Sequence, residues 1–71
     1  MEKIVKITTD YIKLDSLLKF AGIAETGGDA KRLIRDGRVY VNEEICTMRG
    51  KKIVPGDTVR FGDIIFTVGY E

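Results

Sequence analysis

Cations are the side chains of this 71-residue chain with the clearest capacity to bind a ligand. Lysine and arginine number 12 against 11 acidic residues, so the formal charge is only +1. Residues 31–60 nevertheless carry eight basic residues, including all five arginines, and only four acidic ones. A planar guanidinium suits phosphate groups and stacks on flat rings. The middle of the chain therefore favours an anionic partner.

Groups that could catalyse a reaction are scarce. The chain has no histidine, so the usual base for a serine or cysteine nucleophile is missing. Its one cysteine, Cys46, allows no internal disulfide and no multi-cysteine zinc site, and a small apolar packing role is expected for it. Glu43 and Glu44 are adjacent in a predicted turn, which indicates solvated carboxylates rather than an acid–base pair. We expect no catalytic residue, no metal and no cofactor.

Two glycines, Gly27 and Gly28, open the second predicted helix and could present backbone N–H groups to a phosphate. The lysine and serine or threonine of a nucleotide-binding P-loop do not follow them, which disfavours nucleotide hydrolysis.

The second helix is the element that would position most of these cations. Thr26 is its predicted N-cap, Asp29 fits a capping box, and Gly37 ends it. At about 100° per residue, Ala30, Leu33 and Ile34 form the apolar face of this helix. Lys31 and Arg35 lie together beside that face, and Arg32 lies further from it around the helix. Lys31 and Arg35 are like charges four residues apart, which mildly destabilises a helix. That pairing favours an anionic partner over a purely structural role.

The remaining pattern predicts a small β-rich frame. A first helix has an apolar face of Leu14, Leu17, Leu18 and Ala21 and ends at Gly22. Strands are predicted at residues 4–9, 38–42, 58–61 and 64–70, which gives the order β-α-α-β-β-β, and residues 45–47 are a less defined extended segment. Turns are predicted at Pro55-Gly56-Asp57 and Gly62-Asp63, and residues 48–52 form a basic loop.

The aromatic residues divide between interior and surface. Phe20, Phe61 and Phe66 are predicted to lie in the core. Tyr40 alternates away from Val39 and Val41, so it is predicted to be exposed, where it could stack on a base. Ordinary surface packing is the more common role for such a tyrosine.

An ordered set of motifs spans residues 12–57. It consists of Lys13-Leu14-Asp15 followed by Leu17-Leu18, then Gly22, Thr26, Ala30, Leu33-Ile34, Gly37, Val39, Val41-Asn42 and Gly56-Asp57. This arrangement resembles the S4 RNA-binding domain, found in a small-subunit ribosomal protein, pseudouridine synthases and tyrosyl-tRNA synthetases. The resemblance implies an α+β, S4-like (alpha-L) fold in which two short helices pack on a small, mostly antiparallel sheet, as a single domain over residues 1–71.

Two stretches are similar to small, stand-alone bacterial S4-like proteins, namely Thr26-Gly27-Gly28 and Arg49-Gly50-Lys51-Lys52. That resemblance implies an RNA-binding accessory factor linked to ribosomal RNA and ribosome assembly. Two positions depart from the larger S4 proteins. Gly27 stands where an arginine is usual, and Glu43 stands where a glycine usually follows Val-Asn.

The family resemblance and the cations on one flank of the second predicted helix together predict a set of RNA-binding residues. Its members are Lys13, Thr26, Lys31, Arg32, Arg35, Arg38, Arg49, Lys51 and Lys52. Lys31 and Arg35 stand first because both arguments select them. The loop cations have the alternative of being merely solvated. Arg38 has the alternative of a strand-edge charge that discourages aggregation.

The expected partner is structured RNA, either ribosomal RNA or a ribosomal subunit, bound by a monomer. We expect a cytoplasmic protein because the start lacks an apolar signal core and the longest uncharged stretch, residues 64–70, is far shorter than the roughly 20 residues of a membrane span. The alternative is a protein-binding adaptor that docks through its acidic first third. A ubiquitin-like sulfur carrier is disfavoured because the chain ends Val68-Gly69-Tyr70-Glu71 rather than in Gly-Gly.

Overall fold

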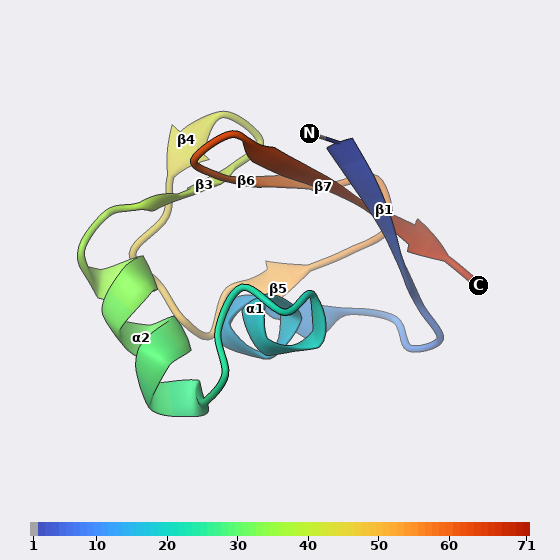
Figure 1. Cartoon of the computed structure of the whole chain (residues 1–71). Coiled ribbons are helices and arrows are strands. Elements are labelled where there is room, and N and C mark those ends of the chain that lie inside the picture. The colour runs from blue at the N-terminus through green and yellow to red at the C-terminus, as the bar shows by residue number, and fades with distance from the viewer. Residues whose placement is uncertain (1) are drawn as a thin grey trace.

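Seven strands and two helices make up the chain, which the computed structural model describes from residue 2 to residue 71 (Figure 1). They are β1 (Glu2–Ile7), β2 (Ile12–Lys13), α1 (Leu14–Phe20), α2 (Gly27–Arg35), β3 (Val39–Val41), β4 (Glu44–Ile45), β5 (Lys52–Ile53), β6 (Thr58–Phe61) and β7 (Ile64–Tyr70). Both predicted helices and the strands predicted at 58–61 and 64–70 are confirmed.

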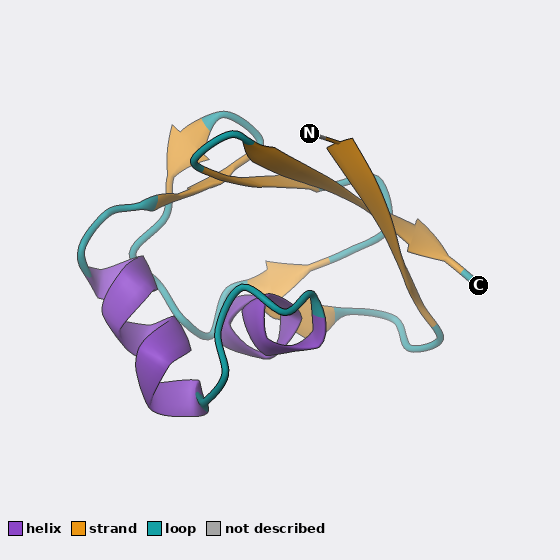
Figure 2. Ribbon diagram, in the orientation of Figure 1, coloured by secondary structure: helices purple, strands orange, loops and turns teal. Residues whose placement is uncertain are grey.

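Five of the strands form one sheet in the order β1-β7-β6-β3-β4. Only the β1–β7 pair is parallel, so the sheet is mostly antiparallel, as predicted. Both helices lie on one side of this sheet (Figure 2). The first strand was predicted at residues 4–9 but occupies Glu2–Ile7, because its partner β7 ends at Tyr70, opposite Ile7.

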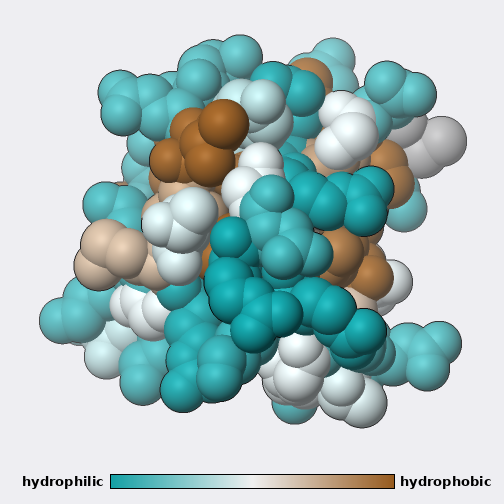
Figure 3. Space-filling model, turned by 90° about the vertical axis from the view of Figure 1, so that its left-hand side faces the viewer, coloured by the Kyte–Doolittle hydropathy of each residue, from teal (hydrophilic) through white to brown (hydrophobic). Residues whose placement is uncertain are grey.

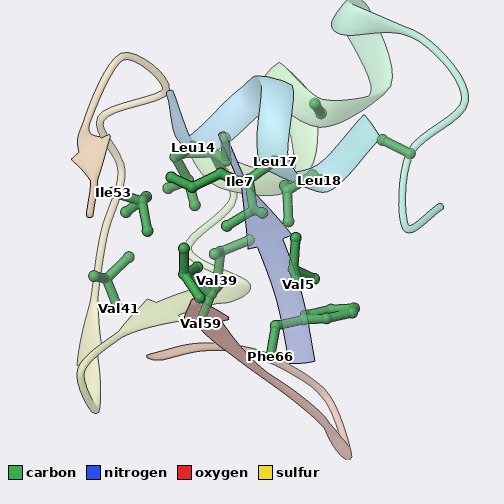
Figure 4. Packing of buried hydrophobic residues seen from close by; sticks show 14 residues of the cluster. Val5, Ile7, Leu14, Leu17, Leu18, Val39, Val41, Ile53, Val59 and Phe66 are labelled. Carbon is green, nitrogen blue, oxygen red and sulfur yellow. The ribbon is translucent and has the colours of Figure 1, made fainter. Parts of the chain in front are cut away.

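The core fills the space between the helices and the sheet. Leu14, Leu17 and Leu18 of α1 point from one side toward Val59 and Phe66 on the other (Figure 4). All five are at most 2% exposed. Because α1 buries its apolar stripe here, its start is held in a fixed place above the sheet.

The ends of α2 follow the predicted signals. The Thr26 side-chain oxygen accepts a hydrogen bond of 3.1 Å from the backbone N–H of Asp29, which makes Thr26 the N-cap. After the helix, Gly37 takes a φ of +74°, a conformation that glycine adopts at little cost. The helix that carries three of the predicted RNA contacts is therefore fixed at both ends.

A two-stranded ribbon, β2 paired with β5, was not predicted. It sets Ile12 opposite Ile53 and Lys13 opposite Lys52 in antiparallel register. Ile53 is completely buried, so this short ribbon is attached to the main core. The ribbon ties the basic loop at residues 48–52 to the start of α1.

The prediction for Phe20 was wrong, since its side chain is 66% exposed. Phe20 lies on the side of α1 opposite Leu14 and Leu18, and the helix ends at this residue. Phe66 is buried as predicted, and Phe61 is half-buried against the core. Cys46 is half-buried there too, in line with a packing role.

The Val-Asn and Gly-Asp motifs meet in space. The Asn42 side-chain amide donates a 3.1 Å hydrogen bond to Asp57, and its oxygen accepts one of 2.9 Å from the backbone N–H of Thr58. The other Asp57 carboxylate oxygen accepts a 3.0 Å bond from the backbone N–H of Val54. These two motifs therefore join two turns, and their role is to hold the fold.

Glu43 occupies a strained position in the turn between β3 and β4. Asn42 and Glu43 have φ values of 50° and 72°, the pattern of a two-residue turn that favours Asn-Gly. We expect Glu43→Gly to raise the free energy of unfolding by about 1 kcal/mol, because a side chain at positive φ is unfavourable. Urea unfolding measures the change. Glu44→Gly is the matched control, since Glu44 lies in a strand and its replacement should lower stability. A Glu43→Gly protein no more stable than the parent would contradict the assignment of strain.

Candidate nucleic-acid interface

The basic loop is fastened to the start of α1 by backbone hydrogen bonds. The N–H of Leu14 donates to the carbonyl of Lys51 at 2.9 Å, and the N–H of Asp15 donates to the carbonyl of Arg49 at 3.0 Å. The first N–H groups of a helix have no partner within the helix, so the loop satisfies two of them. The loop cations consequently have a defined place beside α1 rather than on a free loop.

Four predicted residues come together here, and we call them the ribbon cations: Lys13, Arg49, Lys51 and Lys52. All four are exposed, and none forms a salt bridge with any of residues 2–71. Lys13 and Lys52 are directly opposite each other across the ribbon. Like charges at opposed positions destabilise a strand pair, so this arrangement carries a cost that an anion would relieve.

Lys31 and Arg35 form a second group on the exposed flank of α2, the helix that packs against α1. Lys31 has no salt bridge within the described chain, and the Arg35 guanidinium lies 3.9 Å from the Asp36 carboxylate, with both side chains more than half exposed. An ion pair this long and this exposed contributes little to the stability of the fold. Figure 3 shows the face on the α2 side, where strongly hydrophilic side chains fill the centre and lower part of the surface.

Arg32 and Arg38 have different surroundings. The Arg32 guanidinium makes a 2.7 Å ion pair with Asp29, and the Arg38 guanidinium carbon lies 5.4 Å from the centre of the Phe61 ring. Both arginines line a shallow hollow that also contains three acidic residues, Glu25, Asp29 and Asp36. The acids outnumber the arginines there, so this hollow is less suited to a phosphate than the ribbon cations or the α2 flank.

Thr26 and Gly27 begin α2. The Thr26 hydroxyl oxygen is used by the helix cap, and the residue remains exposed to solvent. A Cβ atom placed at Gly27 would meet no atom within 4 Å beyond its chain neighbours and the backbone of its own helix. Space therefore does not require a glycine at the position where larger S4 proteins carry arginine.

Tyr11 lies beside the ribbon cations, although it is not among the site residues predicted from the sequence. The Lys52 ammonium is 4.9 Å from the centre of the Tyr11 ring, and Tyr11 is 39% exposed. The prediction that Tyr40 is exposed holds only in part: it is half-buried, and the Arg60 guanidinium covers it at 4.1 Å. The only sequence signal for Tyr11 was its place two residues before Lys13, on the same face if that segment is a strand.

No group of three or more cysteine, aspartate or glutamate side chains in residues 2–71 is arranged to hold a metal ion. No helix in the same residues is long and apolar enough to cross a membrane.

Comparison with known proteins gives one family and two informative relatives. The family model of the S4 domain matches residues 5–69. A protein of Bacillus subtilis named "Probable ribosome maturation protein RlbA" is 38% identical over 55 residues, which cover 78% of each chain. A protein of Escherichia coli named "Putative RNA-binding protein YbcJ" is 41% identical over 51 residues, which cover 72% of this chain and 73% of that one.

Proposed function

Because this chain belongs to the S4 domain family, we propose that it is a non-catalytic protein that binds structured RNA through the ribbon cations and the α2 flank. The proposed contacts are Lys13, Lys31, Arg35, Arg49, Lys51 and Lys52, with Thr26 at the helix start. Arg32 and Arg38 stay predictions at the margin of this surface, because carboxylates share their hollow.

The observation that carries the proposal is the pairing of like charges. Lys13 opposes Lys52 across the ribbon, and Lys31 precedes Arg35 by one helical turn. Each arrangement costs stability in the isolated protein. The ribbon pair makes no salt bridge within residues 2–71, and the α2 pair has the exposed 3.9 Å contact between Arg35 and Asp36. A phosphate backbone would supply the missing negative charge.

The proposed mechanism is recognition of shape and backbone charge. The loop backbone is bonded to α1, and α2 is capped at both ends, so the cations need little ordering when RNA binds. Neutralised phosphates release counterions, which supplies free energy and makes binding dependent on salt. A surface of this size contacts too few groups to read a long sequence, so RNA shape would determine the choice of target.

Ribosomal RNA is the target we propose, with a role in ribosome maturation in the bacterial cytoplasm. The support is the name of the Bacillus subtilis relative, whose alignment covers 78% of this chain. The name of the Escherichia coli relative supports RNA binding more generally.

Crosslinking in cells, followed by sequencing of the bound RNA, tests the target. We expect ribosomal RNA to be enriched over an unrelated neutral protein of similar size. In vitro, binding to a folded ribosomal RNA fragment should weaken with salt, with a log–log slope of about −3 to −5 for 4–6 phosphate contacts. A protein partner that survives nuclease treatment, without RNA enrichment, would instead establish the adaptor alternative.

A further inference from the structure

The outward face of the β2–β5 ribbon carries both charged and apolar side chains. Lys13 and Lys52 are opposed there. Tyr11 and Val54 lie two residues from them along the chain, just beyond the ends of the two short strands, and continued alternation would set them on the same face. Ile12 and Ile53 alternate to the other side, where Ile53 is completely buried. The exposed face therefore combines two cations, one aromatic ring and one aliphatic side chain.

Tyr11 is held in place by its neighbours. The Thr9 hydroxyl donates a 2.8 Å hydrogen bond to the Tyr11 carbonyl, which tightens the turn that leads into β2. The Lys52 ammonium lies 4.9 Å from the centre of the ring, a cation–π contact. Tyr11 is thus positioned while the residue remains 39% exposed.

We propose that Tyr11 is a stacking site for an unpaired nucleobase of the bound RNA, with Lys13 and Lys52 contacting the phosphates beside that base. The inference rests on the proposed RNA binding and adds a base-contacting residue to it. Bases stack on aromatic side chains whatever their identity, and lysines close to the ring would hold the backbone of the same nucleotide. A single-stranded loop, bulge or end presents such a base, whereas a continuous duplex does not.

Charge orients the nucleotide at this site. Thr9, Asp10 and Tyr11 line a shallow hollow, and the Lys52 ammonium lies 4.9 Å from the centre of the Tyr11 ring. Phosphates are repelled by Asp10 and attracted by Lys13 and Lys52. The base would therefore occupy the hollow while its backbone runs along the ribbon.

Tyr40 is less suited to this role. The Arg60 guanidinium covers its ring at 4.1 Å, and the residue is half-buried on the sheet. Tyr70 is 62% exposed but lies on β7, outside the ribbon. Among the three tyrosines, Tyr11 alone combines an exposed ring with a neighbouring lysine pair.

The test compares two RNAs with equal numbers of phosphates, a hairpin with an unpaired loop and a blunt-ended duplex, by fluorescence anisotropy. Tyr11→Leu should weaken hairpin binding by on the order of 10-fold or more, as removal of one stacked base does. Binding to the duplex should change by less than about twofold, because the phosphate contacts remain. Tyr11→Phe should retain hairpin affinity, and Tyr70→Leu is the matched control away from the ribbon.

A second readout uses the absence of tryptophan from the chain. Tyr11→Trp introduces one tryptophan, whose fluorescence should be quenched by the hairpin and not by the duplex if a base stacks on the ring. Equal effects of Tyr11→Leu on hairpin and duplex, or unchanged affinity for both, would overturn the stacking site while leaving the proposed RNA binding intact. Failure of the unaltered protein to bind either RNA would overturn the proposed function itself.

Discussion

Replacing both Lys31 and Arg35 by glutamate is expected to weaken binding of a folded ribosomal RNA fragment by on the order of 100-fold. Each residue is proposed to make a charge-assisted hydrogen bond to phosphate, an interaction worth about 1.5–3 kcal/mol. The substitutions also place two negative charges where two positive ones were. A gel-shift or anisotropy titration at fixed salt measures the change.

The salt dependence of the same complex gives an independent measure of these interactions. Replacement of Lys31 and Arg35 by glutamine removes two cations without adding acids at the carboxyl end of α2. The log–log slope should then become shallower by about 2, or about 1 for each phosphate that is no longer neutralised. This slope separates reduced phosphate neutralisation from a general decrease in the amount of folded protein.

The control for net charge is the pair Lys3→Glu and Lys6→Glu, which makes the same change in charge on exposed residues of β1. Figure 1 shows β1 and α2 at opposite sides of the molecule. This control should retain most of the affinity, and both double variants should unfold at nearly the temperature of the parent. An equal decrease in affinity in the two double variants would show that net charge, rather than the α2 flank, governs binding.

The elements that could be predicted are those whose signals are local. Helix α2 has its cap at Thr26, its apolar stripe and its terminating Gly37 within twelve consecutive residues, and all of these function as expected. The β6–β7 hairpin is similar, because Gly62-Asp63 lies between two β-rich runs. In both cases the information that defines the element is contained in the element itself.

The β2–β5 ribbon could not be predicted for the opposite reason. Each of its strands has two residues, and Ile12 pairs with Ile53 far along the chain. Such short runs have no usable periodicity, and their pairing depends on where α1 and the sheet have already been placed. Because the ribbon was missed, the proximity of Tyr11 to Lys52 was missed with it.

The charges of the candidate site could be predicted more readily than their partners. The excess of basic residues in residues 31–60 pointed to seven of the nine predicted site residues, and the family resemblance added Lys13 and Thr26; all nine are exposed. The 2.7 Å pair between Arg32 and Asp29, however, depends on rotamers that a charge count does not contain. Likewise, the Asn42 and Asp57 motifs matched the family pattern, but only the structure reveals that they bond to each other.

The largest effect on stability is expected from Ile53→Ala. Ile53 is completely buried and is the residue of β5 that joins the ribbon to the core. Truncation of a buried isoleucine to alanine costs about 2–5 kcal/mol. At about 0.05–0.15 kcal/mol per residue, a chain of this length has only about 4–11 kcal/mol in total. We therefore expect the melting temperature to fall by about 8–40 °C, since 1 kcal/mol corresponds to about 4–8 °C in so small a domain.

The same substitution should reach the candidate site, because β5 carries Lys52 and follows directly on Lys51. At temperatures where the Ile53→Ala protein is still folded, its affinity for RNA should be lower than that of the parent, because the ribbon is held less firmly against α1. Val54→Ala is the matched control, since Val54 is the next residue, is 43% exposed, and keeps its backbone bond to Asp57. Thermal unfolding followed by circular dichroism, with RNA titrations at low temperature, distinguishes the two variants. If Ile53→Ala melts within a few degrees of Val54→Ala, the ribbon is not anchored by Ile53, and the preorganisation of the ribbon cations has to be assigned to the backbone bonds with α1 alone.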